Sequence, residues 1–292
     1  MNYKDIWWMM REAFSAWNQH EAPRMGAALA FYTILSLAPL VILVISIVAL
    51  VIGESSAQDQ LIGQVRNMVG NQGAEAVKGL IDQAREPAAG SFAVVIGVLT
   101  LLIGASGVFG ELRSGLNKIW NVAPRQESGV WAELRLRFFS FGMVLAVGFL
   151  LLVSLLVGTA LAAVGKFFGG MLPLPEFVLG GIDLMVSLGG TVILFALMFR
   201  YVPETKIAWR RLWVGATATA IMFTLGKFLI GLYLGKAGVG SAYGAAGSFV
   251  VLIVWVYYSA MIFLFGAEFT HVLGLHGEEQ KVKLQKSLDK YL

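Results

Sequence analysis

The chain has 292 residues, of which 58% are hydrophobic and only 14% charged, and it contains 34 glycines and no cysteine. Soluble domains carry about 25% charged residues, so this composition argues against a soluble globular protein. The absence of cysteine excludes disulfide bonds, thiolate metal sites and a cysteine nucleophile. The net charge of +4 does not by itself indicate nucleic-acid binding, because the basic residues cluster beside the apolar blocks, as in membrane proteins. We therefore expect an all-α membrane protein.

The first 20 residues predict an amphipathic helix. Ile6, Met10, Phe14 and Trp17 recur at helical spacing, and charged residues lie off that stripe. Two interpretations are open, namely a helix that lies on the membrane surface and a helix that packs on the bundle.

Six apolar blocks follow, each long enough to cross a hydrocarbon layer of about 30 Å as a helix. The predicted spans are 25–53, 87–110, 138–165, 177–199, 212–235 and 245–267. Together with the segments between them they form one transmembrane domain over residues 1–292. The polar segment 54–86 has apolar residues at helical spacing and glycines at 70–73, so we expect two short helices that cap the bundle on its extracytoplasmic side.

The distribution of basic residues orients the chain. Sixteen of the 22 Lys and Arg residues fall in the N-terminal segment, the loops 111–137 and 200–211, and the tail 268–292. Five fall on the opposite side of the predicted spans. The positive-inside rule therefore places both termini in the cytoplasm, in agreement with six spans.

Two of the spans resemble each other. Residues 88–92 and 245–249 both read Ala-Ala-Gly-Ser-Phe, and both segments reach a glutamate, Glu111 and Glu268, after the same distance. The likeness predicts a parallel repeat, an arrangement that occurs in transporters. The alternative is chance similarity between two short apolar helices.

Two ionisable residues lie inside predicted spans. Asp183 is about 10 Å along its helix from Glu176, and Lys227 is about 12 Å from Gly235, so their depths match. A charge within a span costs at least about 2.5–3.5 kcal/mol unless it is paired or hydrated. We expect the two side chains to approach each other or to share a cavity that binds an anionic or zwitterionic ligand. The alternatives are a purely structural ion pair and a lysine that snorkels outward.

The other candidate site residues lie around the sixth span. Trp255 and Tyr258 are candidates to line a binding cavity, although aromatic residues in membrane helices are more often packing residues. Candidates for gating are the residues at which regular helix is expected to kink or end: Pro39, Gly235, Gly244 and Gly247. Glu111 and Glu268, at the ends of two spans, are most simply interfacial carboxylates.

An enzyme finds no support in the sequence. The three histidines, His20, His271 and His276, do not have the spacing of a helical metal pair, and no nucleophile motif or phosphate-binding loop is present. We expect no catalytic residues, no cofactor and no metal. The partners expected are membrane lipids and not nucleic acid, and the small-residue faces permit a homo-oligomer without demanding one.

Several short motifs together resemble the YihY/BrkB family of bacterial inner-membrane proteins, once mislabelled ribonuclease BN and also named virulence factor BrkB. They are Gly26–Thr33 with Ser36–Pro39, Leu116-Asn117 with Trp120, Tyr201–Pro203 with Trp209-Arg210, and Tyr243-Gly244 with Trp255, Tyr257 and Gly266–Glu268. The resemblance covers nearly the whole chain. It implies six spans in the bacterial inner membrane and no settled biochemical activity or catalytic residues.

We therefore expect a transporter-like protein that moves or binds a lipid or another anionic amphiphile. The alternative is a non-transporting envelope scaffold that binds partners, and a ribonuclease is the least favoured interpretation. A cavity or lateral opening would favour the first, whereas a dry, close-packed bundle would favour the second.

Overall fold

The computed structural model describes residues 3–84, 91–122, 176–205, 207–236 and 243–288. Every regular element in these ranges is helical, as predicted. The elements are α1 (Tyr3–Gln19), α2 (Ala22–Ile52), α3 (Glu54–Ala84), α4 (Ser91–Ile119), α6 (Glu176–Tyr201), α7 (Trp209–Lys236), the 3-10 turn η1 (Gly244–Ala246) and α9 (Gly247–Leu288).

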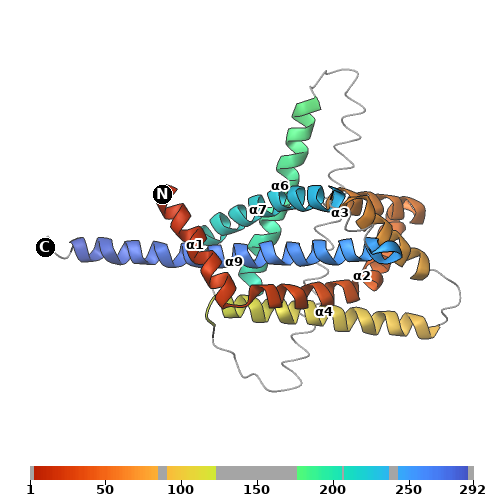
Figure 1. Cartoon of the computed structure of the whole chain (residues 1–292), viewed down its shortest axis with the longest axis horizontal. Coiled ribbons are helices and arrows are strands. Elements are labelled where there is room, and N and C mark those ends of the chain that lie inside the picture. Colours follow the sequence, from red (N-terminus) through yellow and green to blue (C-terminus); the bar gives the residue numbers. More distant parts are fainter. Residues whose placement is uncertain (1–2, 85–90, 123–175, 206, 237–242, 289–292) are drawn as a thin grey trace.

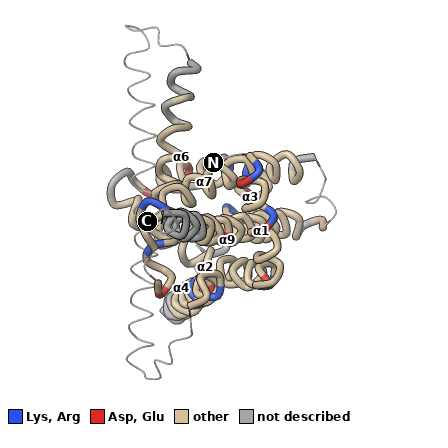
Figure 2. The backbone as a smooth tube through the Cα atoms, turned by 90° about the vertical axis from the view of Figure 1, so that its left-hand side faces the viewer, with Lys and Arg blue, Asp and Glu red and all other residues tan. Residues whose placement is uncertain are grey.

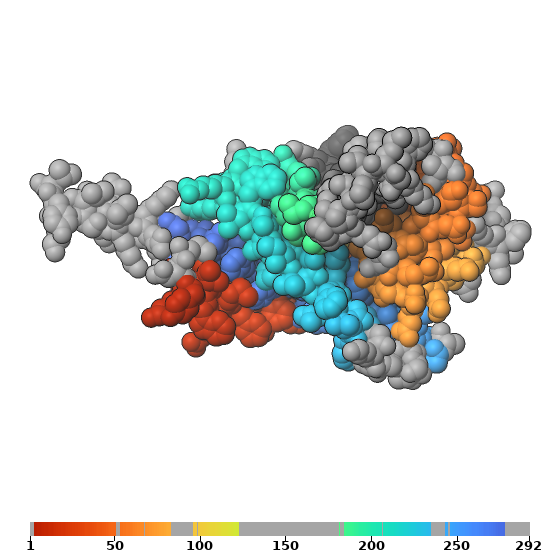
Figure 3. Space-filling model, turned by 90° about the horizontal axis from the view of Figure 1, so that it is seen from above, coloured from red at the N-terminus to blue at the C-terminus, as the bar shows by residue number. Residues whose placement is uncertain are grey.

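Helix α9 runs through the middle of the molecule. Helices α1, α2, α3, α4 and α7 all pack on it, and α4 and α7 lie on opposite sides of it (Figures 1 and 2). Its 42 residues continue beyond the predicted end of the sixth span at Ala267, and its C-terminal part projects past the other helices (Figure 1). Helix α3 covers the end of the molecule opposite α1 (Figure 3).

Local backbone conformation explains where several helices begin and end. Glu21 has a left-handed conformation with φ 59°, which turns the chain sharply between α1 and α2, and Pro23 follows in the first turn of α2. Gly53 ends α2 with φ 82°. Gly70 breaks α3 with φ 85°, a value that favours glycine, within the segment where the sequence predicted a break.

Five of the six predicted spans overlap helices that the structure describes, namely α2, α4, α6, α7 and α9. Four of these helices are long and apolar enough to cross a membrane, over Ala22–Leu50, Leu184–Tyr201, Trp209–Leu234 and Gly247–Gly277. Helix α4 lies where the second span was predicted and continues past Gly110. The third predicted span, 138–165, lies outside the described residues. Large apolar side chains are exposed on the outer faces, which suits a hydrocarbon environment.

Helix α1 packs on α9 through a face that includes part of the predicted stripe. Met9 and Ala13 are fully buried against Phe269 and Val272 of α9. Of the stripe, Met10 and Trp17 are partly buried and pack on apolar clusters, whereas Ile6 and Phe14 are exposed. The interpretation as a packed helix is therefore confirmed. A position of the exposed residues of the stripe at the membrane surface stays a prediction.

A close helix–helix contact joins α7 and α9 through two glycines and two threonines. Thr219 of α7 lies against Gly266 of α9, and Thr270 of α9 lies against Gly215 of α7. Each threonine hydroxyl donates to the carbonyl oxygen of the glycine four residues earlier in its own helix, at 2.7 Å in both cases. The hydroxyls are therefore satisfied within their helices, and the glycines let the two backbones approach closely.

Helices α2 and α4 also pack closely at glycines. A Cβ atom added at Gly104 would lie 2.6 Å from the Cβ of Ser36, and one at Gly107 would lie 2.2 Å from the ring of Tyr32. The Ser36 hydroxyl donates to the carbonyl oxygen of Tyr32 at 3.0 Å. These two glycines therefore let α2 and α4 approach closely.

Substituting Gly215 tests the α7–α9 contact. A Cβ atom at this position would lie 2.2 Å from Oγ1 of Thr270, so Gly215→Ala must push the helices apart. We expect a loss of about 1–3 kcal/mol in stability, measured by unfolding in detergent. The matched control is Gly231→Ala in the same helix, where a Cβ would meet nothing within 4 Å. Equal stability of the two variants would contradict the packing described.

Candidate functional site

An apolar groove of about 470 Å³ lies between α2 and α9. Its walls carry only one polar side-chain atom, the hydroxyl of Tyr257. The lining residues are Ala27, Ala30, Phe31, Ile34 and Leu35 of α2, and Phe249, Ile253 and Tyr257 of α9. These positions recur every three or four residues, so each helix presents one continuous face to the groove. Both helices are long and apolar enough to cross a membrane, so an apolar groove between them suits a hydrocarbon chain.

The groove narrows where α2 and α9 touch. A Cβ atom added at Gly26 would lie 3.3 Å from Sδ of Met261 and 3.5 Å from the ring of Tyr257. The indole N–H of Trp17 donates to the carbonyl oxygen of Met261 at 3.4 Å. The end of the groove at Gly26 is therefore next to α1 and to the turn that joins α1 to α2.

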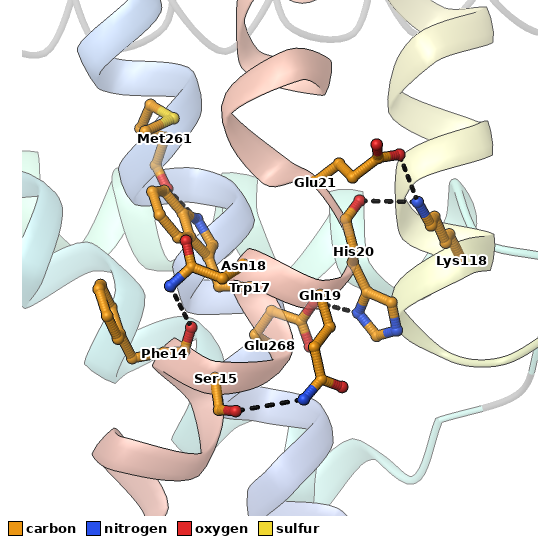
Figure 4. A network of polar contacts seen from close by, with 10 residues as sticks. All are labelled: Phe14, Ser15, Trp17, Asn18, Gln19, His20, Glu21, Lys118, Met261 and Glu268. Atoms are coloured by element: carbon orange, nitrogen blue, oxygen red, sulfur yellow. Dashed lines mark hydrogen bonds and ion pairs between the residues drawn. The ribbon is translucent and has the colours of Figure 1, made fainter.

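A polar cluster surrounds this turn (Figure 4). Nδ1 of His20 and Oε1 of Glu268 are 2.6 Å apart, which joins the turn to α9. Nζ of Lys118 on α4 donates to the carbonyl oxygen of His20 at 2.9 Å and to Oε2 of Glu21 at 3.3 Å. Arg24 pairs with the same Glu21 carboxylate at 2.9 Å. Three helices thus meet at one group of charges.

Glu268 is not the interfacial residue that the sequence suggested. Its side chain is fully buried, and its Oε2 atom has no hydrogen-bond partner. His271, one turn further along α9, packs edge-on against Trp120 of α4 at a centroid separation of 6.4 Å. Position alone could not distinguish a buried carboxylate from an exposed one, because the sequence does not say which helix packs over the end of α9.

Lys227 lies on α7 and is partly buried. Its Nζ atom is 5.8 Å from the centroid of the Phe223 ring, and Phe223 in turn meets Phe195 of α6 edge-on. The lysine therefore has a cation–π neighbour on its own helix. It does not line the groove between α2 and α9.

Asp183 lies in α6, and its side chain is outside the described part of the structure. The residue precedes Phe195 by 12 positions, so it is about 18 Å away along the helix. Figure 1 shows that this early part of α6 leads away from α7. The pairing of Asp183 with Lys227 stays a prediction.

The other predicted site residues occupy the opposite end of the bundle from the polar cluster. Trp255 and Tyr258 pack against the apolar core formed by α2, α3, α7 and α9, and the indole N–H of Trp255 is buried without a partner. Pro39 lies inside the continuous helix α2. Gly235 lies in the last turn of α7, Gly244 begins η1 with φ 55°, and Gly247 begins α9. Their roles in binding and gating are untested by these positions.

The structure joins two of the short sequence motifs that resemble the BrkB pattern. Oδ1 of Asn117 on α4 accepts a hydrogen bond of 2.8 Å from the backbone N–H of Glu204, just after Tyr201–Pro203. Arg113 forms an ion pair with the Glu204 side chain. Arg200 donates to the carbonyl oxygen of Ile207 at 2.6 Å. These residues hold the α6–α7 connection against α4. Sequence reasoning did not connect them, because they are more than 80 positions apart.

Within the described residues there is no group of three or more His, Asp or Glu side chains that could hold a metal ion. The polar arrangements seen in these residues include the ion-paired turn, the half-buried Lys227 and the contacts of Asn117 and Arg113 with Glu204. The apolar feature described above is the groove between α2 and α9.

A family model described as virulence factor BrkB matches residues 13–289. Among curated proteins, a UPF0761 membrane protein of Pseudomonas aeruginosa (strain LESB58) is 29% identical over 256 residues, and one of Verminephrobacter eiseniae is 28% identical over 250 residues. Each alignment covers 85% of this chain and 58% of the relative. A UPF0761 membrane protein of Tolumonas auensis is 32% identical over 186 residues, covering 61% of this chain and 57% of the relative. This chain thus spans less than two thirds of the length of these relatives. No solved structure matches it.

The contact between Asn117 and Glu204 can be tested by substitution. Asn117→Ala removes the acceptor of a partly buried backbone N–H, so we expect a loss of about 1–3 kcal/mol in stability. Thermal unfolding in detergent measures this loss. Asn18→Ala is the control, since Asn18 is exposed and bonds only within its own helix, and it should change stability by less than about 0.5 kcal/mol. An unchanged Asn117→Ala protein would refute a structural role for this contact.

Proposed function

Because this chain belongs to the virulence factor BrkB family, whose curated relatives here are membrane proteins, we propose that it is a transporter-like protein that binds and moves a lipid or another anionic amphiphile. The chain is a multi-pass membrane protein. As part of the proposal, it has six spans in a bacterial inner membrane, with both termini in the cytoplasm.

The groove between α2 and α9 is the observation that carries this proposal. It lies on the side of two membrane-crossing helices and is lined by apolar side chains, with the Tyr257 hydroxyl as the single polar group. An acyl chain gains little by moving from the bilayer into an apolar wall, so affinity must come from shape and from the head group. Exposed Phe31 and Phe249 on the two walls supply rigid surfaces for such a chain.

The polar turn gives the expected place for the head group. Arg24 lies three residues before Ala27, one of the groove residues, and its side chain is 75% exposed. Lys118 lies on the neighbouring α4 and reaches the same turn. Arg24 and Lys118 share the single carboxylate of Glu21, so the turn keeps a net positive charge, which favours an anionic amphiphile over a neutral one. Asp183 and Lys227 would then contact the lipid at a later step of its movement across the membrane. Helix bending at Pro39, Gly235, Gly244 and Gly247 would open the site to one side of the membrane or the other.

A second candidate function is a non-transporting envelope scaffold. It is favoured by the tight contact of Gly215 and Gly266 with Thr270 and Thr219, which leaves no room between α7 and α9. A rigid bundle with exposed cytoplasmic loops would hold partner proteins without moving a lipid. The two functions differ in whether purified protein alone moves an amphiphile across a membrane.

Filling the groove tests lipid binding. Ala27 is exposed on α2, so Ala27→Phe adds a ring to the groove without entering the core. We expect binding of an anionic phospholipid, measured by native mass spectrometry, to weaken about tenfold, or about 1.4 kcal/mol. The control is Leu225→Phe on the exposed face of α7, away from the groove. If both variants bind lipid as the native chain does, the groove is not the binding site.

Movement is tested separately in proteoliposomes. We expect the native chain to move a labelled anionic lipid between leaflets. We expect Lys227→Ala to lower that rate because the anionic ligand loses a positive charge, and Asp183→Ala to lower it because the predicted partner of Lys227 is lost. Each variant must keep its native unfolding temperature for the comparison to count. The absence of movement by the native chain above empty liposomes, across several anionic lipids, would favour the scaffold.

A further inference from the structure

We propose that His20 and Glu268 form a buried proton-binding site that ties the turn between α1 and α2 to the central helix α9. This site is separate from the proposed groove and does not depend on lipid movement. Its ligand is a proton, and its two groups are the imidazole of His20 and the carboxyl of Glu268 (Figure 4).

The geometry restricts Glu268 to one partner. Its side chain has no exposed surface, Oε1 lies 2.6 Å from Nδ1 of His20, and Oε2 has no partner. The separation of 2.6 Å is short, as expected when one of the two groups is ionised or when they share a proton strongly. A lone carboxylate in such a place would carry a large desolvation cost, and among the described residues His20 is the group paired with it.

The cations near Glu268 contact other groups. Lys118 of α4 and Arg24 of α2 both bind the carboxylate of Glu21 and not that of Glu268. His271 of α9 lies one turn from Glu268 and faces Trp120 of α4. Arg211 of α7 lies 3.5 Å from a Cβ placed at Gly274, six residues beyond Glu268. Among the described contacts of Glu268, His20 is therefore the group that can neutralise its carboxylate.

The net charge of the pair depends on how many protons His20 and Glu268 hold together. The pair can hold a carboxylate beside an imidazolium, or a carboxylic acid beside a neutral imidazole. Both forms have zero net charge and contain the same single proton, which moves between Oε1 and Nδ1. Removing that proton leaves a buried carboxylate beside a neutral ring, so the net-neutral forms are the ones that burial favours.

The position of the site determines how protons reach it and which contact their loss would weaken. The His20 side chain is 21% exposed, so protons exchange with water through its outer face while Glu268 stays buried. His20 is followed by Glu21, whose left-handed conformation forms the sharp turn, and its carbonyl oxygen is held by Lys118. Loss of the proton therefore weakens the attachment of α1 to α9.

Histidine-selective NMR of the full chain in lipid nanodiscs tests this proposal, because the chain has three histidines and each signal can be assigned by substitution. We expect the ring nitrogens of His20 to shift in Glu268→Gln, while those of His276 stay unchanged. The matched control, Glu21→Gln, alters an exposed carboxylate in the same turn and should leave the His20 ring signals in place. Identical His20 ring signals in the native chain and in Glu268→Gln would overturn the proposal.

Infrared difference spectra between about pH 5 and pH 8 provide a second measurement that does not depend on one variant. We expect a carboxyl signal in the native chain that is lost in Glu268→Gln, altered in His20→Gln and retained in Glu21→Gln. If the signal persists in Glu268→Gln, the proton belongs to another group and the proposal is wrong. If the signal is unaltered in His20→Gln, the two residues do not share a proton, and the proposal is wrong as well.

Discussion

The close approach of α9 to its neighbours is the constraint on which the rest of the structure depends. A central helix can accept helices on several sides only where side chains are small, and glycines supply that space at Gly266 and, on the facing helices, at Gly215 and Gly26. The contact of Gly26 with Met261 and Tyr257 also decides where α2 and α9 separate. The groove residues begin at Ala27, the position after this contact.

The same packing creates the polar end of the bundle. Because α1 crosses α9 through Met9 and Ala13, the turn that follows α1 covers Glu268 and brings His20 onto it. A carboxylate that would be solvated on an isolated α9 is thereby buried and dependent on one imidazole. The turn thus connects three features of the protein, namely helix α1, the end of the groove between α2 and α9, and the buried acid.

Long apolar blocks and glycine breaks in the sequence predicted the helices and their order, including the break of α3 at Gly70, because these depend on local composition. The faces that meet were harder to predict. Only part of the stripe on α1, Met10 and Trp17, packs on the bundle, and Glu268 is buried, because both depend on which helix crosses over α9. The groove joins residues more than 200 positions apart, and no local pattern marks it. Tyr257 lines it, whereas the predicted Trp255 and Tyr258 pack in the core.

The central claim is that the face between α2 and α9 holds an acyl chain, and photo-crosslinking in native membranes measures this most directly. A phospholipid with a photoreactive acyl chain would be incorporated, activated and mapped to residues by mass spectrometry. The account predicts adducts concentrated on the groove residues, such as Phe31, Ile34 and Phe249. Adducts spread evenly over other exposed apolar side chains, such as Leu225 and Phe228 of α7, would contradict it.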